Sequence, residues 1–134
     1  MKFLVTGSTG LVGSQVVKDL SEPSNQIYSC YNNSKPESGI PLKMDLTNFE
    51  SITNAIETIK PEIIIHLAAM TNVDLCETQK ELALTINAKA TEVISKQAAK
   101  TGAFFVYVST DYVFDGKSGM KKENDLANPI GFYG

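Results

Sequence analysis

The sequence predicts an α/β fold built as a doubly wound parallel sheet, and three observations support this. Short β-branched and aromatic runs alternate with helical patterns, as in proteins built from βαβ units. A glycine-rich turn separates the first such run from the first helix. The chain has 134 residues, 43% of them hydrophobic, which is enough for one domain with a sizeable core.

The first part of the chain alternates strand and helix. Residues 2–6 form an apolar run that enters the glycine turn, and we predict the first strand there. Residues 11–20 have apolar positions at helical spacing, so we expect a helix whose buried face consists of Leu11, Val12, Val16, Val17 and Leu20. Residues 26–31 are predicted as the second strand, and residues 40–44 as a short third strand that ends at Asp45.

The same alternation continues to the fifth strand. A helix is predicted over 47–59, with a buried stripe formed by Phe49, Ile52, Ile56 and Ile59. Residues 62–67 include three consecutive isoleucines, which suit a strand covered on both faces. The remaining predictions are a loop at 69–78, a long helix at 79–100 capped by Gly102, a strand at 104–108 and a loop at 109–134.

The turn from Gly7 to Gly13 is the main functional signal. Its three glycines stand at three-residue intervals between an apolar strand and an amphipathic helix. We expect Gly7 to turn the chain with a positive φ, Gly10 to let a diphosphate approach the backbone, and Gly13 to let the helix pack against the first strand. The N–H groups at the helix start would then bind the diphosphate. The turn therefore predicts an NAD(P)-binding, Rossmann-like domain, and it lacks the lysine of an ATP-binding P-loop.

Composition and charge argue against several other classes. The net charge of −3 gives no electrostatic reason to expect a nucleic acid partner. No apolar run reaches the ~18 residues of a membrane span, and no signal peptide is recognisable at the N-terminus. Cys30 and Cys76 are isolated and show no metal-ligand spacing, so we expect free thiols, no metal and a cytoplasmic protein.

Several segments, taken in order, resemble the extended short-chain dehydrogenase/reductases. Within that family the chain is most similar to the dTDP-4-dehydrorhamnose reductase branch of sugar-nucleotide reductases. The resemblance covers the whole chain but only about the first half of a typical member. We therefore expect residues 1–134 to be an incomplete NAD(P)-binding domain, truncated before the substrate-binding half. The matching segments are Gly7–Gly13, Asp45-Leu46-Thr47, His66–Ala69 with Thr71–Glu77, Ser109–Gly116 (STDYVFDG) and Asn128–Gly134 (NPIGFYG).

The resemblance implies NAD(P)H-dependent reduction of a 4-keto-6-deoxy sugar nucleotide. Tyr133 matches the catalytic tyrosine that gives a proton to the substrate oxygen. Thr110 would bond the same oxygen, and Asp111 would contact the substrate. The alternative for Thr110 and Asp111 is that they only cap a strand end, and Tyr133 could be an ordinary loop aromatic. The family's lysine, four positions after the tyrosine, falls beyond Gly134, so the chain as given is expected to be a poor catalyst.

The resemblance also implies a set of cofactor-binding residues. Asp45 would reach the adenine amino group, although a helix-capping role fits it equally well. Residues 31–35 contain no acidic residue and include Lys35, which favours NADPH over NADH. Asn87 either braces the active site or faces solvent, and His66 is not expected to be catalytic. The full cofactor set is Gly7, Thr9, Gly10, Leu11, Val12, Gly13, Tyr31, Asp45, Leu46, Ala68, Ala69 and Thr71.

Two other functions stay open at this point. One is a non-catalytic regulatory subunit, similar to the methionine adenosyltransferase β subunit, which keeps the fold for partner binding. The other is an NAD-dependent sugar-nucleotide epimerase or dehydratase, against which the STDYVF run argues. The expected partner is the nucleotide-sugar substrate, and the sequence leaves a homodimer open.

Overall fold

The computed structural model describes every residue from Met1 to Gly134, and its centre is one five-stranded parallel sheet. The strand order is β3-β2-β1-β4-β5, and all neighbouring strands run parallel. The order reverses between β1 and β4, which confirms the doubly wound sheet. The strands are β1 (Lys2–Thr6), β2 (Gln26–Tyr31), β3 (Ile40–Lys43), β4 (Ile63–His66) and β5 (Phe104–Tyr107).

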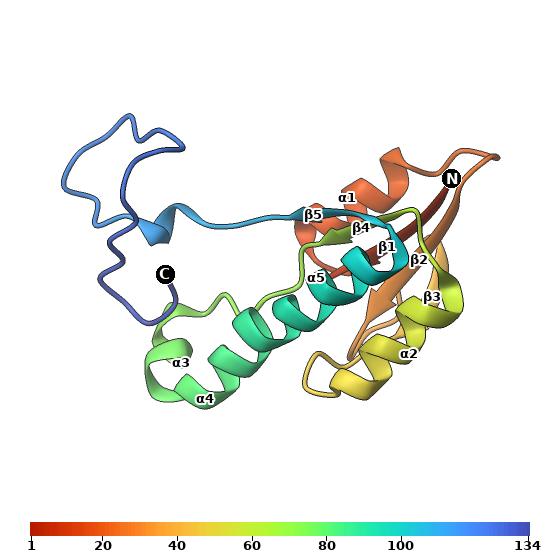
Figure 1. Cartoon of the computed structure of the whole chain (residues 1–134), viewed down its shortest axis with the longest axis horizontal. Coiled ribbons are helices and arrows are strands. Elements are labelled where there is room, and N and C mark those ends of the chain that lie inside the picture. The colour runs from red at the N-terminus through yellow and green to blue at the C-terminus, as the bar shows by residue number, and fades with distance from the viewer.

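Helices lie on both faces of this sheet (Figure 1). Helix α1 (Leu11–Asp19) covers one face, and helices α2 (Phe49–Ile59) and α5 (Ala90–Thr101) pack side by side on the other. Successive residues of a strand point to opposite faces, so β1 contributes to two cores. The smaller core consists of Phe3, Val5, Val17 and Ile27, and the larger one of Leu4, Cys30, Met44, Ile52, Ile56, Ile59, Ile64, Ala90, Ile94 and Ala98.

The predicted buried face of the first helix is only partly correct. Val17 is buried, and Val16 and Leu20 pack partly buried against the smaller core. Leu11 and Val12, however, are 93% and 59% exposed. These two side chains line the pocket at the carboxyl ends of the strands and belong to neither core. The stripe predicted for α2 is confirmed, because Ile52, Ile56 and Ile59 are buried and Phe49 is partly buried.

The segment after β4 is more helical than predicted. The predicted loop at 69–78 is wrong in its second half, where Asn72 caps a short helix, α3 (Val73–Thr78), by accepting a hydrogen bond from the Leu75 N–H at 2.9 Å. The long helix expected at 79–100 begins at Lys80, because Gln79 is a non-helical cap, and it changes its geometry along its length. It consists of α4 (Lys80–Ala83), a π-helical segment η1 (Leu84–Lys89) and α5, and it ends at Gly102 with φ +75°.

The chain after β5 is irregular, as predicted, apart from one 3₁₀ turn, η2 (Asp111–Val113). It extends away from the sheet and then returns, so that Gly134 lies near α3 (Figure 1). No helix in the structure has both the length and the apolar character that crossing a membrane would take.

Candidate functional site

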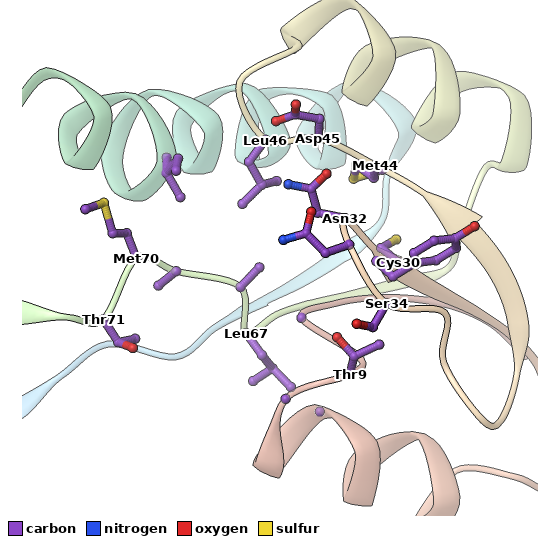
Figure 2. Close-up of a pocket in the computed structure, with 18 of the residues that line it drawn as sticks. Thr9, Cys30, Asn32, Ser34, Met44, Asp45, Leu46, Leu67, Met70 and Thr71 are labelled. Carbon is purple, nitrogen blue, oxygen red and sulfur yellow. The ribbon is translucent and has the colours of Figure 1, made fainter. Parts of the chain in front are cut away.

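A cleft of about 940 Å³ lies just beyond the carboxyl ends of β1 to β4 (Figure 2). Ligands of open α/β sheets bind at this edge, where the strand order reverses, and the volume is within the ~300–1,000 Å³ of small-molecule sites. All twelve residues predicted to bind a cofactor line it, namely Gly7, Thr9, Gly10, Leu11, Val12, Gly13, Tyr31, Asp45, Leu46, Ala68, Ala69 and Thr71.

The glycine turn forms the floor of the cleft, and two of its glycines admit no side chain. Gly7 has φ +67°, and a Cβ there would lie 2.8 Å from the Ala68 nitrogen. A Cβ on Gly13 would lie 2.1 Å from the Gly7 carbonyl oxygen. Gly13 thus lets α1 approach closely the turn that directly follows β1, and α1 packs against β1 through Val17. A Cβ on Gly10 would meet only the Gly7 carbonyl oxygen, at 3.3 Å, so this position is open toward the cleft.

The start of α1 is suited to an anion. The first N–H groups of a helix have no partner within the helix. Gly10, the N-cap, has no side chain to bind them, and the first turn contains no acidic residue. The partial positive charge of the helix N-terminus adds to these N–H groups. The cleft therefore presents hydrogen-bond donors and positive potential where a diphosphate would lie.

A buried hydrogen-bond chain fixes the wall opposite α1. Thr6 Oγ1 accepts hydrogen bonds from the N–H groups of Leu67 and Ala68, both at 3.1 Å, and these occupy its two lone pairs. The Thr6 hydroxyl therefore acts as the donor in its third hydrogen bond, to His66 Nδ1 at 2.6 Å. The other ring nitrogen, Nε2, therefore carries the hydrogen and donates to Thr91 Oγ1 at 3.0 Å. This set of hydrogen bonds requires a neutral His66.

Burial lowers the pKa of His66 to about 4, in keeping with the neutral ring that the hydrogen bonds require. The ring also stacks with Phe105 and Tyr107 of β5, with centroids 6.3 and 5.8 Å away. Thr91 completes the chain by donating to the Asn87 carbonyl oxygen at 2.7 Å. The carboxyl ends of β1 and β4 are thus tied to the helical segment beneath them.

Asn87 holds the next part of the same wall and does not face solvent. Its Oδ1 accepts from the Met70 N–H at 2.7 Å, and its Nδ2 donates to the Met70 carbonyl oxygen at 2.9 Å. Met70 lies between Ala69 and Thr71, and all three line the cleft. Of the two interpretations of Asn87 from the sequence, the bracing one fits this geometry.

Asp45 lies where the cleft meets the start of α2. Its Oδ1 accepts from both the N–H and the hydroxyl of Thr47, at 2.8 Å each, and these bonds hold its pKa below the usual range. Its Oδ2 makes no hydrogen bond within the chain. Asp45 therefore structures the turn before α2 and also lines the cleft, with one carboxylate oxygen free of hydrogen bonds.

The end of β2 forms the third side of the cleft, and sequence reasoning missed part of it. The buried Ser8 donates two hydrogen bonds to the Cys30 carbonyl oxygen, from its hydroxyl at 2.8 Å and from its N–H at 3.3 Å. These bonds hold the glycine turn against β2. Burial raises the pKa of the Cys30 thiol to about 12, so the thiol stays protonated. Other lining residues not predicted are Cys30, Asn32, Asn33, Ser34, Met44, Leu67, Met70, Leu75, Gln79, Leu82 and Ile86.

A smaller hollow of about 270 Å³ adjoins the cleft between the glycine turn and the loop after β2. Thr9 and Ser34 line both spaces. Lys35, Lys18 and Glu37 line only the smaller one, so it holds two cationic groups and one anionic group.

The predicted catalytic residues lie outside the cleft lining. Thr110 Oγ1 accepts from the Tyr112 N–H at 3.2 Å, so this hydroxyl caps the turn η2. Asp111 is exposed, and its Oδ1 lies 3.4 Å from Thr110 Oγ1. Tyr133 is half-buried, and its ring meets that of Tyr112 edge-on with centroids 5.5 Å apart. The structure thus brings these residues to one region, with no hydrogen bond between Thr110 and Tyr133.

No three His, Cys, Asp or Glu side chains are grouped so that they could hold a metal ion.

Comparisons with known proteins identify one family and relatives of two kinds. A family model described as "RmlD substrate binding domain" matches residues 1–134. Methionine adenosyltransferase 2 subunit beta of Xenopus tropicalis is 39% identical over 134 residues, which are 99% of this chain and 39% of that protein.

Two solved structures are also similar. A hypothetical dTDP-4-dehydrorhamnose reductase from Sulfolobus tokodaii has a TM-score of 0.93 and 41% identity, over 99% of this chain and 48% of that one. The dTDP-4-dehydrorhamnose reductase of Bacillus anthracis in complex with NADP has a TM-score of 0.85 and 32% identity, over 98% and 45%. The chain thus spans less than half the length of these relatives.

Proposed function

Because the chain belongs to the RmlD substrate-binding domain family, we propose that it is the cofactor-binding part of an NAD(P)H-dependent reductase of 4-keto-6-deoxy sugar nucleotides. The observation that carries this proposal is the cleft at the reversal of strand order, lined by all twelve residues predicted for a dinucleotide. The similar Bacillus anthracis reductase in complex with NADP supports it. We place the protein in the cytoplasm, in keeping with its two unpaired cysteines.

The lining of the cleft fits a dinucleotide in three places. The N–H groups at the start of α1 meet the diphosphate, and the open position at Gly10 lets it approach the backbone. The small side chains of Ala68 and Ala69 leave room for ribose and phosphate along the opposite wall. The unpartnered Oδ2 of Asp45 accepts a hydrogen bond from the adenine amino group.

When bound, a reduced nicotinamide supplies the hydride that the ketone carbon accepts. The ketone oxygen then takes a proton, for which Tyr133 is the donor. The Thr110 hydroxyl donates a hydrogen bond to that oxygen, and Asp111 binds a hydroxyl of the substrate. A free tyrosine has a pKa of ~10, so a cation beside Tyr133 is needed for proton transfer near neutrality.

NADPH is the proposed cofactor form. The hollow beside the cleft contains Ser34 and Lys35, which suit a 2′-phosphate. Residues 31–35 hold no carboxylate to bind the 2′-hydroxyl of NADH.

Titration calorimetry of the chain with NADP⁺ and NAD⁺ tests both parts of this proposal. We expect NADP⁺ to bind more tightly than NAD⁺. Tighter binding of NAD⁺ would overturn the NADPH preference, and no binding of either at millimolar concentration would overturn the function itself.

A second candidate is a non-catalytic regulatory subunit, which the identity to methionine adenosyltransferase 2 subunit beta favours. The gene sequence beyond Gly134 separates the two. A lysine at the third codon after Gly134 supports the reductase, because it would stand four positions after Tyr133. Turnover of dTDP-4-dehydrorhamnose with NADPH by the full-length protein is the direct assay. A protein that binds NADP⁺ but gives no turnover would be assigned to the subunit.

A further inference from the structure

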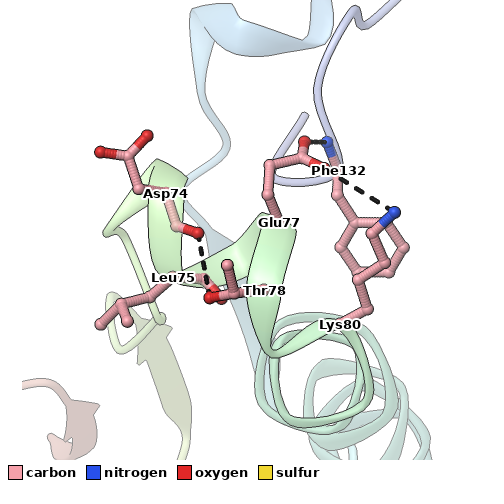
Figure 3. Close-up of polar contacts among 6 residues, drawn as sticks. All are labelled: Asp74, Leu75, Glu77, Thr78, Lys80 and Phe132. Carbon is pink, nitrogen blue, oxygen red and sulfur yellow. Dashed lines mark hydrogen bonds and ion pairs between the residues drawn. The ribbon is translucent and has the colours of Figure 1, made fainter.

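We propose that Glu77 is a positioning residue that docks the segment carrying Tyr133 onto α3. This inference rests on the proposed role of Tyr133 as proton donor. Glu77 stands on α3, 55 residues before Phe132, and its Oε1 accepts the backbone N–H of Phe132 (Figure 3). Because Phe132 directly precedes Tyr133, this bond fixes the backbone one residue before the proton donor.

The fit between the carboxylate and the returning segment is close. A Cβ on Gly131 would lie 3.2 Å from Glu77 Oε1, so the backbone before Phe132 also lies against the carboxylate. A carboxylate that accepts a backbone N–H makes a charge-assisted hydrogen bond, which is stronger than one between neutral groups. The contact is therefore specific in geometry and favourable in energy.

Lys80 strengthens the same docking point from α4. Its Nζ lies 3.8 Å from Glu77 Oε2 and 5.3 Å from the centroid of the Phe132 ring. Figure 3 shows Lys80 beside both partners. An exposed ion pair contributes little by itself, so we assign Lys80 a supporting role and Glu77 the main one.

The other side of the segment rests on η2, which also contains the turn capped by Thr110. The Asn128 N–H donates to the Val113 carbonyl oxygen at 2.8 Å, and the Tyr133 ring packs edge-on against Tyr112. These contacts hold the segment against η2, and the bond from Glu77 adds a contact with α3. Tyr133 is thus held between α3 and the turn that Thr110 caps.

Asp74 provides a matched control on the same helix. It stands three residues before Glu77, and its side chain points away from Phe132 (Figure 3). Glu77 and Asp74 both lie outside the lining of the cleft. Neither substitution should therefore change cofactor affinity directly.

The test compares Glu77→Ala, Glu77→Gln and Asp74→Asn in the full-length protein. Hydrogen exchange of the peptide over 128–134 should be on the order of tenfold faster in Glu77→Ala, because one charge-assisted hydrogen bond is lost. Glu77→Gln keeps an acceptor oxygen and should restore most of the protection, and Asp74→Asn should match the wild type. For the reductase, kcat should fall in Glu77→Ala while the Kd for NADP⁺ changes less than about twofold, and Glu77→Gln should recover most of kcat.

The outcomes separate this inference from the proposed function. Unchanged exchange, or unchanged kcat, in Glu77→Ala overturns the positioning role while NADP⁺ binding and turnover of the wild type still support the reductase. Failure of the wild type to bind either NADP⁺ or NAD⁺ overturns the reductase. An equal loss of kcat in Asp74→Asn would point to a general effect on α3 and would also overturn the role of Glu77.

Discussion

Thr6 Oγ1 lies 2.6 Å from His66 Nδ1, and this contact joins β1 to β4 where the strand order reverses. Because Thr6 must donate its hydrogen, Nδ1 must stay unprotonated. If Nδ1 were protonated, its N–H would face the Thr6 O–H, and two donors would meet. The Thr6 hydroxyl would then have to turn, which would weaken the hydrogen bonds that it accepts from the Leu67 and Ala68 N–H groups. The hydrogen-bond chain is therefore complete only with a neutral histidine.

The first prediction concerns stability against pH. His66 has its pKa lowered from 6.5 to about 4 by burial, so between these values the unfolded chain binds a proton that the folded chain does not. Stability is then lost as pH falls from about 6.5 to about 4, by about 3 kcal/mol in total. The ring faces Thr6, Thr91, Phe105 and Tyr107, and no carboxylate among these offsets the effect.

Urea unfolding at several pH values between 7 and 4.5, on wild type and His66→Asn, measures this effect. The asparagine keeps an acceptor for Thr6 but cannot titrate. We expect a lower absolute stability in the variant, because ring packing is lost, and a flatter dependence on pH. Carboxyls with lowered pKa, such as that of Asp45, contribute equally to both proteins. Parallel pH curves would show that His66 does not cause the dependence.

The second prediction separates folding from binding within the glycine turn. Gly7→Ala forces an L side chain to φ +67° and to 2.8 Å from the Ala68 nitrogen, so we expect a loss of at least about 2 kcal/mol in the free energy of unfolding. Gly10→Ala meets only the Gly7 carbonyl oxygen at 3.3 Å, so stability should change by less than about 1 kcal/mol. Its methyl group should nevertheless lower NADP⁺ affinity on the order of tenfold or more. Thermal melts and calorimetry check both, and wild-type affinity in a folded Gly10→Ala would contradict the diphosphate position.

How much of this site follows from sequence depends on how local each feature is. The sequence was sufficient to predict the bounds of β1 and β2 and the positive φ of Gly7. These features depend mainly on neighbouring residues. Leu11 and Val12 are exposed and line the cleft, although they fit the apolar face of the helix. Periodicity within the helix does not show which part of that face lies over the sheet.

The wall of the cleft shows the same limit more clearly. The hydrogen bonds of His66 join residues 60 and 25 positions apart, and no spacing in the sequence signals them. The helix α3 was missed because six residues between polar segments give too short a periodic pattern. Asn72, with the acidic Asp74 in the first turn after it, is a recognisable N-cap signal, and it could have shown where the predicted loop ends.

The third prediction concerns the brace after β4. Asn87→Ala leaves the Met70 N–H and carbonyl oxygen without their side-chain partners. We expect a loss of about 1–3 kcal/mol in stability, together with weaker NADP⁺ binding, because Ala69 and Thr71 lose their fixed position. Lys89→Ala, at an exposed position two residues on, is the control and should leave both quantities near wild type. Unchanged NADP⁺ affinity in Asn87→Ala would show that Met70 is held by other contacts.

The fourth prediction concerns the choice between the two dinucleotides, which depends on the charges of the smaller hollow. If a 2′-phosphate binds there, Lys35→Ala should weaken NADP⁺ about three- to tenfold and leave NAD⁺ unchanged, because only NADP⁺ carries that phosphate. Glu37→Gln should act in the opposite direction, because it removes a like charge from the same hollow. Both effects should shrink at high salt, where exposed charges are screened. Calorimetry with both dinucleotides at low and high salt measures this, and equal losses for NADP⁺ and NAD⁺ in Lys35→Ala would assign Lys35 to the shared part of the cofactor instead.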